Sequence, residues 1–113
     1  MSVARNNPAG SIVVLVTASS PLEAEKIGRT LVEERLAACA NVVPAIHSFF
    51  RWQGKVCEES ETLLIIKSRH NLFPSLLARV QTLHSYTLPE VIALPILEGS
   101  PNYLAWIHDS TTQ

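Results

Sequence analysis

Residues 48–67 place the strongest constraint on the fold, because their pattern predicts a β-hairpin with a single turn. Aromatic and β-branched residues dominate both arms, and Gly54 lies between them, where a residue free to adopt positive φ can reverse the chain. The first arm extends back through Val42, Val43 and Pro44. Because proline cannot donate a ladder hydrogen bond, we expect this arm to lie at a sheet edge or to carry a bulge near Pro44.

Three aromatic residues, Phe49, Phe50 and Trp52, lie close together on this first arm. Successive strand residues point to opposite faces of a sheet, so Phe49 and Phe50 cannot both enter the core of one subunit. An exposed aromatic edge strand promotes aggregation, and another copy of the same chain is the simplest cover for it. We therefore expect a closed oligomer. The alternative is that the three side chains fill the core of a monomer.

A central strand and a helix are predicted before the hairpin. Residues 11–17 are apolar and β-branched without alternation, which indicates a strand covered on both faces. The helix that follows has Ser20 as its N-cap and Glu23 at the capping-box position. Its apolar face fades at residues 38–40, and we expect Asn41 to end it in a left-handed conformation.

A second helix, a last strand and a short third helix are predicted after the hairpin. Asn71 is the expected N-cap of the second helix, which ends near His84. Residues 88–97 form the last strand, which is bounded by prolines. The third helix runs through residues 101–107, and we expect residues 109–113 to fray.

This order of elements predicts a ferredoxin-like βαββαβ sandwich of the α+β class with an extra C-terminal helix. We expect one domain over residues 11–113, after a flexible tail at residues 1–10. Two helices cover only one face of a four-stranded sheet, yet the strands at residues 12–16, 63–66 and 91–97 are apolar on both faces. Burial of the second face in an oligomer accounts for this surplus.

Composition limits the classes of partner. The chain has nine basic and ten acidic residues, a net charge of −1 and no cluster of Lys or Arg, so we expect no nucleic-acid partner. Cys39 and Cys57 lie at no metal or redox spacing and read as buried reduced thiols, with a disulfide between them left open. No apolar run has the length of a signal peptide or a membrane span, so we expect a cytoplasmic protein without a membrane partner.

Five short motifs lie in order along the chain. They are Arg35-Leu36-Ala37-Ala38-Cys39-Ala40-Asn41-Val42-Val43-Pro44, Trp52-Gln53-Gly54-Lys55, Glu61 with Ile65-Ile66-Lys67, His84-Ser85-Tyr86-Thr87-Leu88-Pro89-Glu90, and Tyr103-Leu104-Ala105-Trp106. As a set they resemble the CutA divalent-cation tolerance proteins. The resemblance implies a tight homotrimer, similar in assembly to the PII signal-transduction proteins. It also implies a cytoplasmic role linked to tolerance of copper and other divalent metals, and it supplies no established reaction.

The resemblance implies one candidate metal ligand, His84. Metal binding in some members of the family is attributed to a cysteine in the first strand and to a pair of histidines, and this chain has Val16 and Leu83 at two of those three positions. The loss of sulfur weakens a site for soft Cu(I), although copper or another divalent cation remains the cofactor to consider. Judged from its position alone, His84 is also a suitable residue to end a helix.

A polar set remains among the motif residues, and we predict that it lines a cleft between subunits: Trp52, Glu61, Lys67, Tyr86 and Glu90. Lys67 and Glu90 are expected to meet there as a charge pair, either as a salt bridge that locks the trimer or as part of a ligand pocket. A lining of Lys, Tyr and Trp fits a small anionic or zwitterionic metabolite. The remaining histidines, His47, His70 and His108, are dispersed and are predicted to lie on the surface.

The sequence therefore predicts a trimeric protein of the divalent-metal tolerance type that binds a small ligand or signals, without catalysis. Two alternatives stay open. One is a dedicated copper or divalent-metal binding protein that uses His84. The other is a small enzyme at the subunit cleft, which no acid–base pair at a defined spacing favours.

Overall fold

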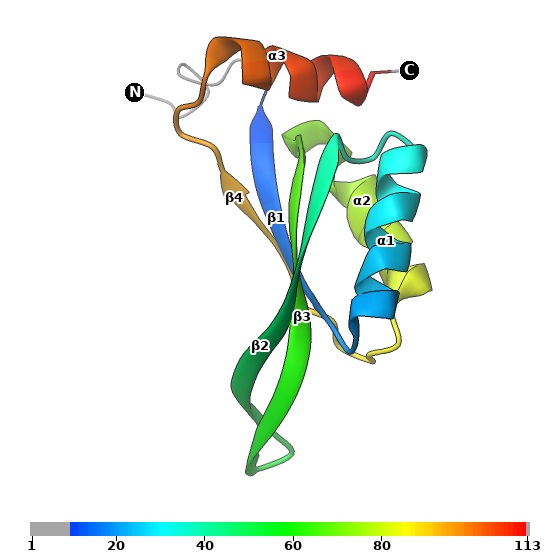
Figure 1. Ribbon diagram of the computed structural model, residues 1–113, viewed down its shortest axis with the longest axis vertical. Coiled ribbons are helices and arrows are strands. Elements are labelled where there is room, and N and C mark those ends of the chain that lie inside the picture. Colours follow the sequence, from blue (N-terminus) through cyan, green and yellow to red (C-terminus); the bar gives the residue numbers. More distant parts are fainter. Residues whose placement is uncertain (1–9, 113) are drawn as a thin grey trace.

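The computed structural model describes residues 10–112, so the predicted tail lies outside the described residues except for Gly10. The elements follow the predicted order of strand, helix, two strands, helix, strand and a final helix (Figure 1). They are β1 (Ser11–Ala18), α1 (Pro21–Glu33), β2 (Cys39–Trp52), β3 (Lys55–Arg69), the 3-10 turn η2 (His70–Leu72), α2 (Phe73–Leu83), β4 (Val91–Pro95) and α3 (Pro101–Ser110). The α+β class and the ferredoxin-like order are confirmed.

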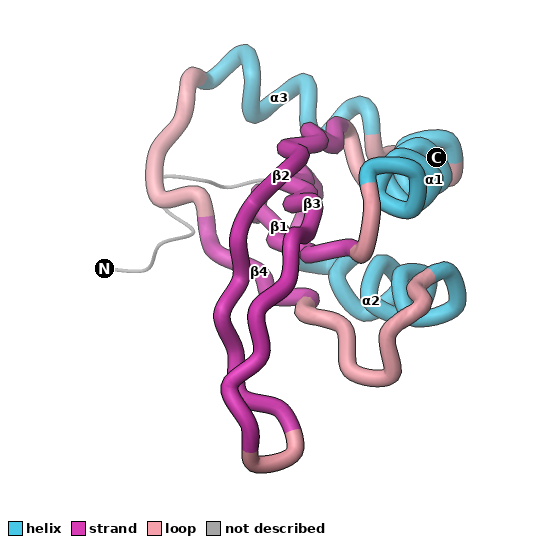
Figure 2. The backbone as a smooth tube through the Cα atoms, turned by 60° about the horizontal axis from the view of Figure 1, so that its bottom comes forward, coloured by secondary structure: helices cyan, strands magenta, loops and turns pink. Residues whose placement is uncertain are grey.

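The four strands form one antiparallel sheet in the order β2-β3-β1-β4. The strand at residues 11–17 is therefore internal, as predicted, and the first arm of the hairpin is an edge. Helices α1 and α2 lie on one side of the sheet, and α3 lies across one end of it (Figures 1 and 2). No helix within residues 10–112 combines the length and the apolar character needed to cross a membrane.

The main core lies between the sheet and the helices α1 and α2. Alternate strand residues enter it, and they pack with the apolar stripes of both helices. The largest fully buried members are Val14, Val16, Ile27, Leu31, Leu64, Ile66, Leu76 and Val80. Gly28 lets α1 approach the sheet, because a Cβ built on Gly28 would lie only 3.1 Å from the Cβ of Ala40.

The opposite face of the sheet is apolar and remains open over much of its area. Leu15 pairs in register with Ile65 on one side and with Ile92 on the other, so these three side chains form a row on that face. Ile92 and its neighbour on the same face, Leu94, are each 48% exposed. The predicted surplus of apolar sheet is thus present in the subunit.

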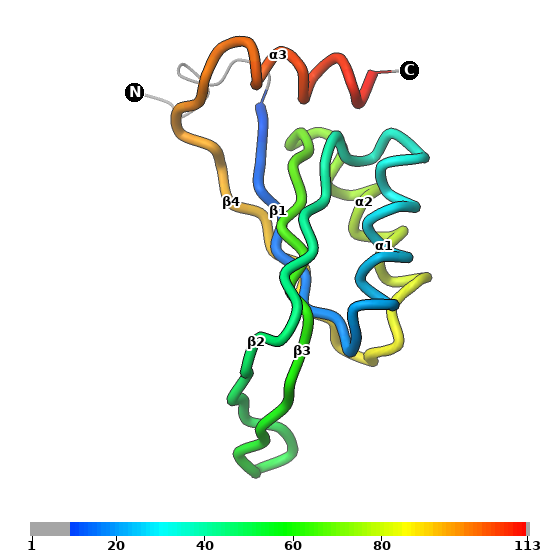
Figure 3. Tube along the Cα trace, in the orientation of Figure 1, coloured from blue at the N-terminus to red at the C-terminus, as the bar shows by residue number. Residues whose placement is uncertain are grey.

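The hairpin formed by β2 and β3 projects beyond the layer of helices (Figures 1 and 3). Gln53 and Gly54 make its turn with φ values of 50° and 79°, as expected for a tight hairpin turn. The register shifts between Val43 and Ile46, where Ala45 has a φ of 61°. The predicted bulge near Pro44 is confirmed, because Pro44 lies in the segment that leaves the ladder.

The predicted end of the first helix was wrong. Helix α1 ends at Glu33, and Arg35 takes the left-handed conformation with a φ of 60°. The N–H groups of Leu36 and Ala37 both donate to the carbonyl of Leu31, at 2.9 and 3.2 Å. Ala37 is buried in the main core, Ala38 is buried against Leu104 and Ile107 of α3, and Asn41 lies inside β2.

Two further boundaries differ from the prediction. Asn71 is not the cap of the second helix, because it lies within η2, and α2 begins after Leu72 without a side-chain cap. The last strand covers five residues rather than the predicted ten, since its ladder to β1 runs only from Val91 to Pro95.

The chain end after α3 is ordered by a tertiary contact rather than frayed. Thr111 is only 2% exposed. Arg69 at the end of β3 donates to the Thr111 hydroxyl from Nε at 2.7 Å and to the Thr111 carbonyl from its guanidinium at 3.0 Å. The prediction of fraying was wrong for residues 109–112, whereas Gln113 lies outside the described residues.

Candidate functional site

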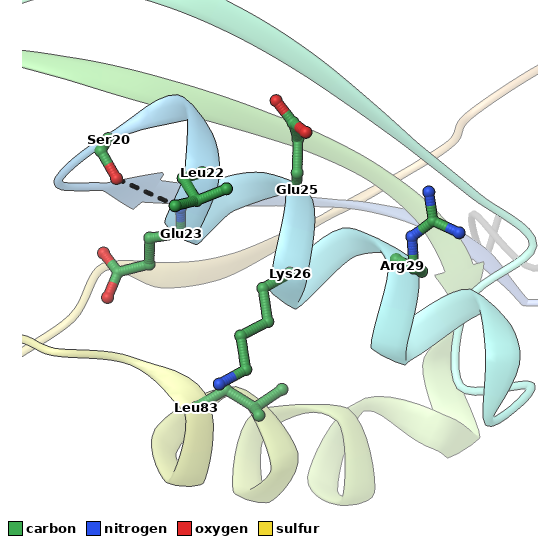
Figure 4. A pocket seen from close by; sticks show the side chains of 7 residues that line it. All are labelled: Ser20, Leu22, Glu23, Glu25, Lys26, Arg29 and Leu83. Carbon is green, nitrogen blue, oxygen red and sulfur yellow. Dashed lines mark hydrogen bonds between the residues drawn. The ribbon is translucent and has the colours of Figure 1, made fainter.

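A hydrogen-bonded network joins the start of α1 to the loop after α2. The Ser20 hydroxyl accepts from the backbone N–H of Glu23 at 3.1 Å, as predicted for an N-cap (Figure 4). The Glu23 carboxylate accepts from the N–H and the hydroxyl of Ser19, both at 2.9 Å, and from the N–H of Ser85 at 2.8 Å. The Glu23 side chain therefore binds the N–H of Ser19, one residue before the N-cap that a capping box usually uses. It also holds the loop after α2 through Ser85.

The same contacts determine the ionisation of Glu23. Partial burial alone would raise the pKa of its carboxyl, but the hydrogen bonds from Ser19 and Ser85 outweigh burial and lower the pKa to about 2. Glu23 is thus a carboxylate over the whole physiological range, and its charge is used to fix the loop.

His84 lies within this network, with its side chain 0% exposed. Its Nε2 lies 2.7 Å from the carbonyl oxygen of Thr17, and its Nδ1 accepts from the N–H of Tyr86 at 3.0 Å. Because a carbonyl can only accept, Nε2 carries the hydrogen and Nδ1 contributes its lone pair. Both ring nitrogens are therefore occupied by protein partners.

This geometry bears on the predicted metal ligand. A metal ion on His84 would have to displace either Thr17 or Tyr86 from the imidazole. Val16, which the resemblance aligns with a cysteine of some family members, is buried in the core. Within residues 10–112, no three His, Cys, Asp or Glu side chains are grouped to hold a metal ion. Metal binding by His84 stays a prediction, and the contacts observed give this residue a structural role.

Tyr86 and Glu61 are the two members of the predicted cleft that the subunit brings together. The Tyr86 hydroxyl donates to the Glu61 carboxylate at 2.7 Å, and Glu61 on β3 is only 8% exposed. Burial and the Glu61 carboxylate both raise the pKa of Tyr86 well above its usual range, so the phenol remains a donor. The Tyr86 ring also packs on His84, with centroids 4.6 Å apart.

The other three members of the predicted cleft lie at different places along the sheet. Trp52 ends β2 at the tip of the hairpin and is 43% exposed. Lys67 pairs with Val13 near one end of the sheet, whereas Glu90 precedes the strand residue Val91 at the other end of the β1–β4 ladder. No ion pair among the described residues joins Lys67 to Glu90. Their meeting across a subunit boundary stays a prediction.

A second polar cluster surrounds Lys67, and the sequence did not identify it as a unit. Cys39 is the cross-strand neighbour of Lys67, and the Lys67 ammonium donates to the side-chain oxygen of Asn41. Tyr103 on α3 contacts Cys39. The pKa of the Tyr103 phenol is raised, mainly by burial and to a lesser extent by this thiol. The period of two between Cys39 and Asn41 could have placed them on one face, but the contact with α3 has no local sequence signal.

The remaining candidates lie where the sequence placed them or close to it. Cys39 and Cys57 are free thiols and are partly rather than fully buried. The other histidines, His47, His70 and His108, are exposed as predicted.

A shallow groove runs beside the first turns of α1 and the end of α2 (Figure 4). Its lining consists of Ser20, Leu22, Glu23, Glu25, Lys26, Arg29 and Leu83. The charges along it have both signs, and the side chains of Ser20 and Glu23 are already hydrogen-bonded at the helix start. The groove therefore shows no preference for one kind of ligand.

Comparison with known proteins assigns the family. The family of the CutA1 divalent ion tolerance protein matches residues 12–110. The divalent-cation tolerance protein CutA of Thermus thermophilus is 52% identical over 99 residues, which cover 88% of this chain and 96% of that protein. The chloroplastic protein CutA of Arabidopsis thaliana is 50% identical over 101 residues, which cover 89% of this chain but only 56% of that protein.

Solved structures agree with this assignment. The divalent cation tolerance protein Cut A1 from Thermus thermophilus superposes with a TM-score of 0.88 at 50% identity and covers 90% of this chain and 99% of its own. CutA1 from Oryza sativa gives a TM-score of 0.88 at 45% identity, with 91% and 94% covered. The chain thus belongs to the CutA1 family of divalent ion tolerance proteins.

Proposed function

We propose that this protein forms a cytoplasmic homotrimer that binds a small ligand and links it to tolerance of divalent metals, copper among them, without catalysing a reaction. The observation that supports this most strongly is the open apolar face of the sheet. A subunit of this size seldom exposes a continuous apolar face unless another protein surface covers it.

Two separate apolar surfaces support assembly with copies of the same chain. One is the row of Leu15, Ile65 and Ile92 on the open face. The other is the edge of the hairpin, where Phe49, Phe50 and Trp52 are 66%, 39% and 43% exposed. Three subunits packed sheet to sheet around an axis would cover both surfaces on every copy, so no subunit would keep an unpaired interface.

The metal link rests on the family, and the contacts of His84 favour an indirect role in metal tolerance. Relatives are named as tolerance proteins rather than as enzymes. A binding or signalling role is consistent with the separation of Lys67 from Glu90, which leaves no acid–base pair of these two residues inside one subunit. The Arabidopsis relative is named as chloroplastic, so the cytoplasmic location is proposed for this chain alone.

Complementation by a variant that cannot assemble tests this proposal. A bacterial strain that lacks its own member of the family receives wild type, Ile92→Lys or Leu22→Lys, and growth is measured at raised copper. Ile92 lies on the open sheet face, whereas Leu22 is 78% exposed on α1, on the side of the helices. Wild type and Leu22→Lys should assemble and restore growth, and Ile92→Lys should do neither.

Two results would count against the proposal. If wild type fails to restore growth, the link to metal tolerance in this chain is wrong. If Ile92→Lys restores growth as a single subunit, tolerance does not depend on assembly.

A further inference from the structure

Lys67 lies on the open face of the sheet among apolar neighbours and without an acidic partner. Its register neighbours are Val13 and Cys39, and Ile65 precedes it on the same face. No carboxylate of the described residues lies within ion-pair distance of its ammonium. The next cation on this face, Arg69, donates to Thr111, so this end of the face is basic.

Several hydrogen-bond donors converge around the Lys67 ammonium. The ammonium donates to the Asn41 side-chain oxygen, which leaves further ammonium hydrogens to donate. That oxygen lies 3.8 Å from the Cys39 sulfur, and the Tyr103 hydroxyl contacts the same thiol. An ammonium, an amide, a thiol and a phenol together form a site with many donors and no negative charge.

Aromatic rings border this cluster. Tyr103 and Trp106 lie on one face of α3, with ring centroids 5.4 Å apart and planes inclined by 35°. They are 43% and 45% exposed, so each ring keeps a free surface beside the cluster. Rings of this kind offer a stacking surface to a planar ligand.

We infer that Lys67, Asn41, Cys39 and Tyr103 form a binding site for a small organic anion that carries a planar ring. The ammonium and the phenol bind the anionic group, and the Tyr103–Trp106 pair contacts the ring. This inference deepens the proposed function and rests on it in one respect: if a neighbouring subunit covers this face, an unpaired ammonium there becomes costly unless an anion, from a ligand or from the Glu90 carboxylate of the neighbouring copy, joins it.

The site differs from the cleft expected from the sequence. Lys67 is common to both, but its aromatic partners are Tyr103 and Trp106 on α3 rather than Tyr86 and Trp52. Tyr86 is already engaged by Glu61, and Trp52 lies at the far tip of the hairpin.

Fluorescence titration tests the inference. Trp52→Phe leaves Trp106 as the single tryptophan, and benzoate serves as the probe, with acetate as the same carboxylate without a ring. Benzoate should give a saturable change at about millimolar affinity or better, and acetate should bind at least several-fold more weakly. Lys67→Met in the same background should weaken benzoate binding at least about tenfold, because a charged hydrogen-bond donor is lost. Lys55→Met, at the far end of the hairpin, should leave it unchanged.

Further variants separate loss of the site from loss of the fold. Lys67→Arg keeps the charge and should retain most of the binding, and Tyr103→Phe should weaken binding several-fold. No saturable response to benzoate in wild type, or equal binding by wild type and Lys67→Met, would overturn the site. Equal binding of acetate and benzoate would overturn the role of the rings.

Particle mass, measured on the same samples, distinguishes this inference from the proposed function. A trimer that shows no response to benzoate contradicts the anion site alone. A single subunit that binds benzoate contradicts the proposed assembly alone.

Discussion

The loop after α2 is held by side chains that each satisfy more than one partner. Glu23 caps the start of α1 and accepts from Ser85, and His84 bridges the carbonyl of Thr17 to the N–H of Tyr86. Tyr86 in turn donates to Glu61 on β3. At the scale of single residues, Glu23, His84, Tyr86 and Glu61 are explained first by the structure that they hold together.

Acid should weaken the fold through Glu23. A carboxyl whose pKa is lower in the folded state stabilises that state above its ordinary pKa, and the stabilisation is lost as pH falls through the folded value. For Glu23 the window runs from 4.5 down to about 2. Urea unfolding should show stability falling across this window, and Glu23→Gln should flatten that fall and cost about 1 kcal/mol near neutral pH.

The matched control is Glu25→Gln, an exposed glutamate on the same helix turn. It should leave the dependence on pH almost unchanged. The same fall in stability in wild type and Glu23→Gln would show that Glu23 is not the group responsible.

Removal of His84 should affect stability and leave metal binding unchanged. His84→Ala deletes both ring hydrogen bonds and leaves the Thr17 carbonyl and the Tyr86 N–H without these partners, so unfolding should become easier by about 1–3 kcal/mol. Calorimetric titration with Cu²⁺ and Zn²⁺ should give equal, weak binding for wild type and His84→Ala. His108→Ala, at an exposed position, is the control for both measurements. Metal binding lost only in His84→Ala would restore this residue as a ligand.

At the scale of elements, features set by a local sequence signal were predicted correctly, whereas features set by tertiary packing were not. Gly54 and Pro44 determine backbone conformation by themselves, so the sequence predicted the turn and, for the arm that contains Pro44, either an edge position or a bulge. The alanines at 37–38 suit a helix and a connecting segment equally, and only packing against the rest of the molecule decides between them. The same limit applies to Thr111, whose order depends on Arg69, 42 residues away in the sequence.

The candidate site shows the same division. His84, Tyr86, Glu61 and Lys67 were named as candidates from the sequence, whereas Cys39, Asn41 and Tyr103 were not assigned to a site. Which of them meet depends on packing: the loop brings Tyr86 to Glu61, and α3 brings Tyr103 to Cys39. Neither contact follows from the spacing of residues along the chain.

The hairpin turn should be most stable with glycine at position 54. The φ of Gly54 is 79°, and a Cβ there would meet no atom within 4 Å, so a side chain costs only backbone strain. Gly54→Ala should lower the free energy of unfolding by about 1–2 kcal/mol. Gln53→Asn, which gives the preferred Asn-Gly pair, should raise it or leave it unchanged. Chemical unfolding measures both, and a neutral Gly54→Ala would mean that the turn adopts another conformation.

At the scale of the molecule, the fold separates two tasks. One face of the sheet forms a buried core with α1 and α2. The other face, the hairpin edge and α3 carry most of the exposed large apolar residues and the Lys67 cluster. The proposed assembly surface and the proposed anion site therefore lie on the same side of the subunit, and a ligand at Lys67 would lie where copies meet.

The most direct test of this account is the mass of the native particle, measured by light scattering after gel filtration at low protein concentration. One chain has a mass of 12.4 kDa. Assembly through the open sheet face predicts a single species of about three times that mass. A stable, well-folded particle of one chain mass would contradict it.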